Sequence, residues 1–313
     1  MTRMTMAAVG VGVLMAGLLA GGCSKSGDAD DKRPKVGFLM TLDHPYWQNM
    51  RLGARDEAEK LGMDVTILNA KEDPVLQIQQ VREIIAKQVD IVCIVPMKKE
   101  PLVRGVQMLN KAGIPVIIVN REVDEGCEYI CFTGTDTYAG AIVSTKILVE
   151  AMGGKGEIVE FHQHLGTGPE LLRSKALREV LKNYPDIKIV ERLGHEGKPE
   201  LVKTEMQTLL QRYPKLGGVY AHGDVFSIAA AQVCRKAGRN EIKIVGMGGS
   251  QEALDAIKDG LMTGTSFQKP EEEGRSAMRL ARKYLDKETL KKNYLIDCPA
   301  ITKENAHKFK GQF

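Results

Sequence analysis

Side chains able to bind or transform a ligand stand directly after short apolar runs that are typical of buried strands. Ligands of open parallel sheets bind beyond the carboxyl ends of the strands, so these side chains are candidates for a single site. They are Asp43, His44, Tyr46 and Trp47; Asn120 and Arg121; His162 and His164; His222 and Asp224; and Gln268.

Carboxylates and imidazoles in such positions invite comparison with catalytic and metal sites. Asp43, Asp136 and Asp224 are suited to acid–base work, but carboxylates in a cleft more often accept hydrogen bonds from ligand hydroxyls. His162 and His164 would share one face of an extended strand, yet no third residue stands at a spacing diagnostic of a metal site. The sequence has no G-x-S-x-G elbow and no phosphate-binding loop. We therefore expect a binding protein and not an enzyme, with no metal and no cofactor.

The elements that position these side chains alternate between strand and helix patterns. Strands are predicted at 36–40, 64–68, 91–95, 116–119 and 128–132, and in a second series at 158–161, 187–191, 219–221, 242–245 and 263–267. Helices are predicted at 47–61, 75–87 and 102–111, and then at 138–152, 170–183, 200–212, 225–236 and 251–259. Alternation of this kind predicts an α/β protein of two similar lobes, each a doubly wound, mostly parallel sheet.

The first residues have the pattern of an export signal. Residues 4–22 carry no charge and end in small residues, as a signal peptidase requires. Cys23 follows them directly, which resembles the lipobox of bacterial lipoproteins, in which this thiol is acylated. A transmembrane anchor is the alternative, but the run is short for ~30 Å of hydrocarbon and rich in Gly. We expect a signal peptide at 1–22, a polar tether at 23–34, and a folded part outside the cytoplasm, periplasmic or at the cell surface, held to the membrane through Cys23.

Charge and cysteine content narrow the partners further. The formal net charge is +4 over 313 residues, and acidic and basic residues are interspersed. This pattern favours neither nucleic acid nor a polybasic membrane surface as a partner. Cys93 lies in an apolar run and is expected to be a buried thiol, whereas a disulfide between Cys127 and Cys131 stays open.

Several motifs occur in one order along the chain and together resemble a known family. They are residues 40–47 (MTLDHPYW), 53–62 (GARDEAEKLG), 114–121 (IPVIIVNR), 134–136 (GTD), 221–224 (AHGD) and 244–246 (IVG), with Asp259, Gly260 and Gln268 after them. From Val36 to about Thr302 the chain resembles the type I periplasmic sugar-binding proteins, the ribose/galactose-binding family that delivers ligands to ABC transporters.

The resemblance implies a lobe organisation and a function. One lobe would comprise 35–136 plus 269–295 and the other 137–268 plus 296–313, with hinge segments near 134–137, Gln268 and Asp297. The protein is then a monomeric lipoprotein that captures a small polar ligand, a sugar or sugar-like compound, between its lobes and delivers it to an ABC transporter permease. The alternative is a sensory module that presents the ligand to a membrane receptor or histidine kinase.

The same resemblance implies roles for individual residues. Tyr46 and Trp47 match the aromatic pair that sandwiches a sugar ring, and Asn120 and Arg121 match the pair that binds ring hydroxyls. Gln268 matches a ligand-contacting residue close to the hinge. Asp136 matches a ligand position or caps the following helix.

Three departures from the family pattern bear on the ligand. Gly248 stands in place of an aspartate, Gly223 in place of an asparagine, and Leu171 where ribose binders carry a second arginine. The replacements available among the cleft residues are the histidines, namely His44, His162, His195 and His222. We therefore expect a small polar ligand other than standard ribose.

Anchoring through Cys23 is testable directly. The Cys23→Ala protein is expected to keep its fold and to leave the membrane fraction, because stable anchoring needs the acyl chains of a mature lipoprotein. Sedimentation of membranes in high salt, followed by immunodetection, measures this. A Cys23→Ala protein that stays with the membranes would show that the assignment is wrong.

Overall fold

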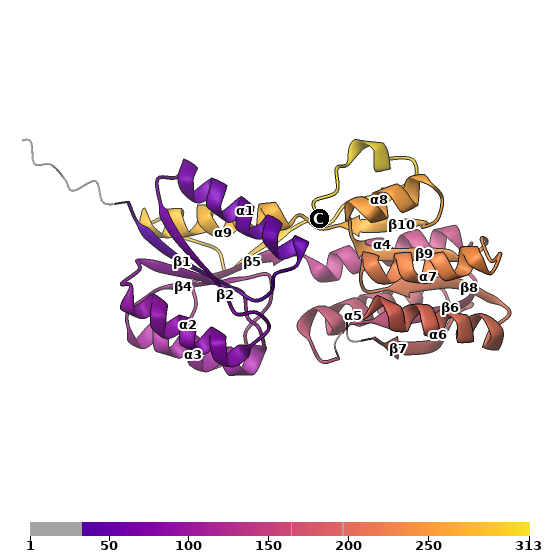
Figure 1. The fold of residues 1–313 in the computed structure, drawn as a ribbon, viewed down its shortest axis with the longest axis horizontal. Coiled ribbons are helices and arrows are strands. Elements are labelled where there is room, and N and C mark those ends of the chain that lie inside the picture. The colour runs from indigo at the N-terminus through magenta and orange to yellow at the C-terminus, as the bar shows by residue number, and fades with distance from the viewer. Residues whose placement is uncertain (1–32, 164, 196) are drawn as a thin grey trace, which may run out of the picture. The chain divides into compact units, whose positions relative to one another are not determined.

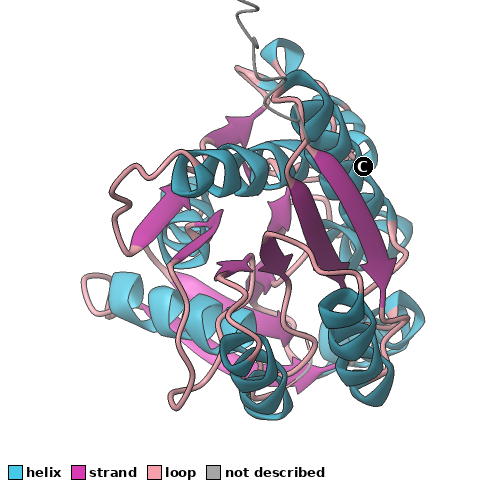
Figure 2. Ribbon diagram, turned by 90° about the vertical axis from the view of Figure 1, so that its left-hand side faces the viewer, coloured by secondary structure: helices cyan, strands magenta, loops and turns pink. Residues whose placement is uncertain are grey.

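The computed structural model describes residues 33–163, 165–195 and 197–313. The described chain forms two six-stranded sheets with helices on both faces, which confirms the predicted α/β fold of two lobes (Figures 1 and 2). Cys23, the predicted signal peptide, the tether up to residue 32, and His164 lie outside the described residues. Among the described residues, no helix is both long and apolar enough to cross a membrane.

The first sheet is entirely parallel. Its spatial order is β11-β5-β4-β3-β1-β2. The strands are β1 (Lys35–Met40), β2 (Asp64–Asn69), β3 (Ile91–Ile94), β4 (Val116–Val119), β5 (Cys131–Thr135) and β11 (Asn293–Ile296).

Helices cover both faces of this sheet because its buried strands are apolar on both sides. In β1, Val36, Phe38 and Met40 pack with α1 (Pro45–Lys60) and α9 (Pro270–Leu285). Leu39 points to the other face, where α2 (Pro74–Ala86) and α3 (Lys99–Lys111) lie. All three strand–helix pairs expected between residues 36 and 111 are therefore present within a few residues.

The second sheet has the order β12-β10-β9-β8-β6-β7, and only β12 runs antiparallel to its neighbour. Its strands are β6 (Gly156–His162), β7 (Ile187–Gly194), β8 (Leu216–Ala221), β9 (Lys243–Gly248), β10 (Gly264–Phe267) and β12 (Ala300–Thr302). One face packs on α4 (Thr137–Ala151) and α5 (Gly168–Leu181). The other packs on α6 (Pro199–Arg212), α7 (Asp224–Lys236) and α8 (Gln251–Lys258). A short 3-10 turn, η1 (Ala306–Lys308), follows β12.

The chain passes between the sheets three times, as the predicted hinge requires. It does so between β5 and α4, between β10 and α9, and between β11 and β12. The domain boundaries set out above are consistent with these crossings but stay predictions.

One predicted strand was misplaced. The apolar run suggested residues 128–132, whereas β5 is Cys131–Thr135. Its pairing with β4 sets Ile117 opposite Cys131, which brings polar Thr133 and Thr135 into the sheet. Both threonines are buried and hydrogen-bonded, Thr133 to Ser276 and Thr135 to Glu273, so tertiary partners make polar strand positions acceptable.

The five cysteines among the described residues are free thiols. Cys93 is fully buried, as predicted, in the core between β3 and α9. Cys127 and Cys131 are not joined, which answers the question that the sequence left open.

The backbones of helices α1 and α9 are in direct contact at two glycines, Gly53 and Gly274. A Cβ atom on Gly53 would collide with the Glu271 carbonyl, and one on Gly274 would collide with the Met50 carbonyl. Both glycines are helical, so the small side chain is required by the close approach of the two backbones. This contact joins elements more than 200 residues apart in the sequence.

The close contact at Gly53 predicts that alanine at this position destabilises the protein, whereas helix propensity alone would predict stabilisation. Gly53→Ala should improve the isolated helix by about 1 kcal/mol, but overpacking against the α9 backbone should destabilise the protein by roughly 1–3 kcal/mol overall. Urea unfolding measures the change. Arg55→Ala, at an exposed position of α1, is the control and should shift stability by less than about 0.5 kcal/mol. A stabilised Gly53→Ala protein would contradict the close packing.

Candidate functional site

Most of the predicted site residues follow the carboxyl ends of strands, as expected. In the first lobe, the central contact is one that the sequence did not suggest. The carboxylate of Glu273, in the first turn of α9, is fully buried. It accepts hydrogen bonds from Tyr46 Oη at 2.9 Å, Asn120 Nδ2 at 2.6 Å, the Thr135 amide at 3.0 Å and the Thr135 hydroxyl. Burial raises the pKa of Glu273, and these donors work against that rise.

The Glu273 cluster, meaning Glu273 with Tyr46, Asn120 and Thr135, therefore holds two predicted ligand residues. Asn120 has a φ of 62°, a left-handed conformation. Gly134 packs directly against its backbone, since a Cβ on Gly134 would lie 2.8 Å from the Asn120 Cα. Tyr46 is only 9% exposed, and burial raises the pKa of its phenol. Both side chains are committed to a protein partner in this structure.

Trp47 belongs to the core side of α1. Its ring meets the ring of Tyr46 edge to face at 5.2 Å, and it is 7% exposed. The guanidinium of Arg121 lies 5.0 Å from the Trp47 ring centroid, a cation–π distance. Arg121 also donates to the Met97 carbonyl at 3.4 Å, and burial lowers its pKa to about 10.

Asp43 and His44 serve the start of α1. Asp43 accepts from Gln48 at 3.1 Å, and both residues are exposed. His44 is the N-cap residue, and its Nδ1 accepts from the Tyr46 amide at 3.3 Å. Burial lowers the pKa of this imidazole.

A cavity of about 200 Å³ lies at the crossing from the first lobe to the second. Asp136 sits at its edge and caps α4 by accepting from the Ala139 amide at 2.9 Å. The residues lining the cavity are Asn120, Arg121, Glu122, Phe132, Thr135, Asp136, Thr137, Tyr138, Gly168, Pro169, Leu172 and Leu295. Three predicted ligand residues, Asn120, Arg121 and Asp136, are thus brought together here.

In the second lobe, the predicted ligand residues His162 and His222 lie close to each other, with ring centroids 6.3 Å apart. His222 is fully buried, and its Nε2 lies 3.0 Å from the carboxylate of Glu160. Burial lowers the pKa of His222 to about 4, so it is neutral near pH 7. Its Nδ1 has no hydrogen-bond partner among the described residues. His162 contacts the Gln163 carbonyl at 2.8 Å through Nδ1.

Glu160 is the buried charge of this second cluster. Burial works to raise its pKa, but hydrogen bonds from His222 and Ser174 outweigh burial and hold it at about 2. The guanidinium of Arg192 lies 3.3 Å from the same carboxylate. The carboxylate is therefore satisfied within the lobe.

Asp224 and Gln268 make contacts within their own lobe. The Asp224 carboxylate is buried and accepts from the Ser250 amide at 2.9 Å and the Thr265 hydroxyl at 2.6 Å. Burial raises its pKa. The Gln268 amide donates to the Gly248 carbonyl at 2.8 Å. Asp224 thus organises the turn between β9 and α8, and a ligand role for either residue stays a prediction.

Sequence reasoning missed Arg173. Leu171, named above as the position of a lost arginine, is 56% exposed, whereas Arg173 is 6% exposed. Arg173 donates to the His222 carbonyl, and its Nε has no hydrogen-bond partner among the described residues. Burial lowers the pKa of Arg173, and electrostatic interactions with Tyr220, Tyr46 and Asp224 partly offset this decrease. The useful signal was an arginine in the first half of a helix that follows a strand end.

Arg121 and Arg173 come from different lobes and share one property. Neither makes an ion pair with a carboxylate within 4 Å among the residues that the structure describes. A guanidinium removed from water needs acceptors, and a ligand rich in hydroxyl oxygens supplies them. The described residues contain no cluster of three or more potential metal ligands.

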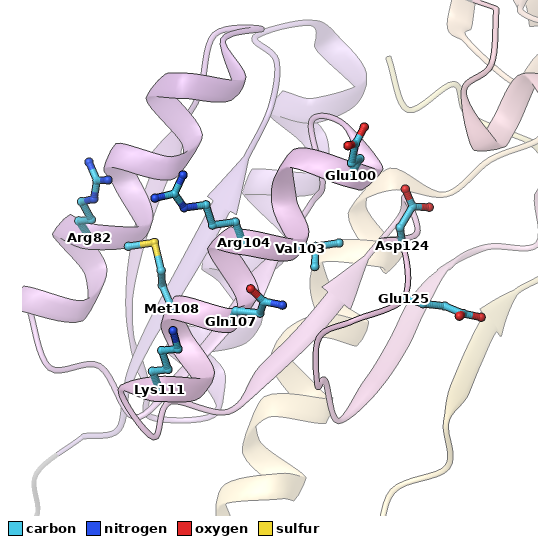
Figure 3. Close-up of a pocket in the computed structure, with 9 residues that line it drawn as sticks. All are labelled: Arg82, Glu100, Val103, Arg104, Gln107, Met108, Lys111, Asp124 and Glu125. Atoms are coloured by element: carbon cyan, nitrogen blue, oxygen red, sulfur yellow. The ribbon is translucent and has the colours of Figure 1, made fainter.

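A larger concavity lies elsewhere. A surface groove of about 660 Å³ runs along α2 and α3, where Arg82, Arg104 and Lys111 lie on one side and Glu100, Asp124 and Glu125 toward the other (Figure 3). None of the predicted site residues lines it, and six of its nine lining residues are charged.

Comparison with known proteins identifies the class. Residues 37–289 match the family model of the periplasmic binding protein domain, so the chain belongs to this family. It is a type I periplasmic binding protein of the sugar-binding group, a family of binding proteins and not of enzymes, whose members work outside the cytoplasm.

Particular relatives share the whole described architecture. The ribose import binding protein RbsB of Escherichia coli is 24% identical over 85% of this chain and 89% of its own length. The xylitol-binding protein of Mycolicibacterium smegmatis is 28% identical over 95% of this chain and 84% of its own. The crystal structure of a solute-binding protein from Actinobacillus succinogenes with bound D-allose is 26% identical, covers 88% of this chain and 100% of that one, and superimposes with a TM-score of 0.83.

Removal of the Glu273 carboxylate is predicted to destabilise the first lobe. Glu273→Ala leaves the donors of Tyr46, Asn120 and Thr135 without an acceptor, at about 1–3 kcal/mol for each buried group, so we expect a loss of roughly 3–5 kcal/mol. Glu273→Gln keeps one acceptor oxygen and should lose less.

Urea unfolding of both variants tests the cluster. The control is Glu272→Ala, whose partner Arg279 lies on the half-buried face of the same helix, and it should change stability by less than about 1 kcal/mol. Equal effects of Glu273→Ala and Glu272→Ala would contradict a structural role for the cluster.

Proposed function

We propose that this protein is an extracytoplasmic solute-binding lipoprotein that captures a sugar or sugar-like ligand between its lobes for an ABC transporter. The observation that carries the proposal is a pair of arginines, the half-buried Arg121 and the buried Arg173, one from each lobe and neither with a carboxylate partner among the described residues. A hydroxyl-rich ligand would satisfy both and draw the lobes together by hinge bending.

The relatives support this ligand class. Proteins of the same architecture are named for ribose import and for xylitol binding, and one was crystallised with D-allose. Two other groups at the strand ends suit the same ligand class. The Nδ1 of a neutral His222 has no partner among the described residues and can accept a hydrogen bond from a ligand hydroxyl. Asn120 lines the cavity beside Arg121. Anchoring of the chain through Cys23 belongs to this proposal, since it would keep the cleft close to a membrane permease.

The experiment that tests the ligand class is a thermal-shift and titration screen with D-ribose, xylitol, D-allose and myo-inositol. A ligand at 100 times its Kd adds about 2.7 kcal/mol to folding stability. Trp47 is the only tryptophan of the chain and lies under Arg121, so its emission should change saturably with one site per chain. Absence of a thermal shift and of an emission change across a wide panel of sugars and polyols would overturn the proposal.

Substitution locates the site. Arg121→Ala removes a charged hydrogen-bond donor worth about 1.5–3 kcal/mol, so the Kd should rise roughly 10- to 150-fold. Arg104→Ala, in the surface groove of Figure 3, is the matched control and should leave the Kd unchanged. A folded Arg121→Ala protein with wild-type affinity would place the site elsewhere.

Transport and sensing are separated in cells. Loss of uptake of the bound sugar in a deletion strain is the expected result. Normal uptake together with lost transcriptional induction by that sugar would favour the alternative sensory module.

A further inference from the structure

The last residues of the described chain return to the strand ends where the predicted ligand residues lie. After η1, residues 309–313 run without regular structure, and Phe313 ends beside Tyr46 with ring centroids 5.3 Å apart at 70°. Phe313 thereby packs against the core of the first lobe although the chain before it belongs to the second. The segment therefore spans the space that the family resemblance assigns to a ligand.

This segment is fastened to the second lobe at three points. The ring of Phe309 packs on Phe267 at 5.2 Å. The Gly311 amide donates to the Gln251 side chain at 3.1 Å, and the Phe313 carbonyl oxygen accepts from the Gln251 amide at 2.9 Å. Gln251 is the first residue of α8, so the segment also satisfies a donor that helix starts leave open. These three contacts indicate that the segment is a fixed part of the second lobe and not a segment that leaves to admit a ligand.

Gly248 provides the room for this ring. A Cβ on Gly248 would lie 3.3 Å from Cζ of Phe313 and 2.6 Å from the Asp224 carboxylate. A larger residue at 248 would thus displace either Phe313 or Asp224. An aspartate at this position would overlap the Asp224 carboxylate and crowd the ring of Phe313.

From this geometry we infer that Phe313 is a specificity-determining residue of the ligand site. It covers Tyr46 and fills the place of the missing aspartate, so the ligand meets a half-buried aromatic ring where relatives of the expected pattern offer a charged acceptor. The inference rests on the proposed function and deepens it by naming the ligand class.

That class is a compact polyol or pentose. A phenyl ring stacks on the C–H face of a sugar but accepts no strong hydrogen bond from its hydroxyls. It also takes volume that a six-membered carbocycle or hexose would need. The site is therefore expected to favour xylitol over D-allose and myo-inositol. D-ribose fits the same volume, but the polar side chains of ribose binders are missing at Leu171, Gly223 and Gly248, so D-ribose is expected to bind more weakly than xylitol.

The experiment compares the Kd values of these four compounds for the wild-type chain and for Phe313→Ala, Phe313→Leu and Lys310→Ala. In Phe313→Ala, binding of the two six-carbon compounds should improve relative to the two five-carbon compounds by about tenfold or more, the usual effect of pocket volume on discrimination. Phe313→Leu keeps most of the volume and should keep the wild-type preference with weaker binding overall. Lys310→Ala, exposed on the same segment, should change nothing.

Two results would overturn the inference. A uniform gain in affinity for all four compounds in Phe313→Ala would show that Phe313 only blocks the site, and an unchanged order of preference would show that Phe313 does not determine specificity. Both results leave the proposed function intact. Absence of binding by the wild-type chain and by every variant would overturn the proposed function and the inference together.

Discussion

The buried carboxylate of Glu273 is the contact on which the geometry of the first lobe depends. A carboxylate loses its hydration when it is buried, and only several well-placed donors make that tolerable. Here the donors come from α1, from the residue that follows β4, and from β5, while the carboxylate comes from α9. Since Thr135 is the last residue of β5, the same carboxylate fixes the start of the first crossing to the second lobe. Tyr46 and Asn120 are therefore positioned by a residue far away in the sequence.

The second lobe uses the same device at two places. Glu160 is held by His222, Ser174 and arginines, and Asp224 is held by the backbone and a hydroxyl around the β9–α8 turn. These internal partners divide the candidate site residues into two kinds. Some complete protein hydrogen-bond networks, and others, chiefly the guanidinium groups of Arg121 and Arg173, retain donors without a carboxylate partner. The second kind is the basis for proposing a hydroxyl-rich ligand.

Close backbone approach is the other recurring constraint. Gly53 and Gly274 allow α1 and α9 to touch, Gly134 allows the backbone of Asn120 to approach, and Gly248 leaves room for Phe313. Except for Gly134, each of these glycines faces an atom from a segment remote in sequence. The absence of a side chain at these positions therefore shapes the packing as specifically as a charged side chain does.

Local patterning determined the class of fold and the places where ligand residues stand. Apolar runs and helical periodicity located ten strands and eight helices to within a few residues, because burial on both faces of a parallel sheet leaves a strong local signal. It also located the strand ends, and with them Asn120, Arg121 and His222. Tertiary structure alone decided the partners. The sequence placed β5 three residues early and overlooked α9, β11, Glu273, Arg173 and Phe313, since their roles depend on segments up to about 270 residues apart that no local pattern connects. Hydrogen bonds to a buried charge and contacts between distant backbones are properties of the folded chain, and they determine which of the residues at the strand ends remain free to meet a ligand.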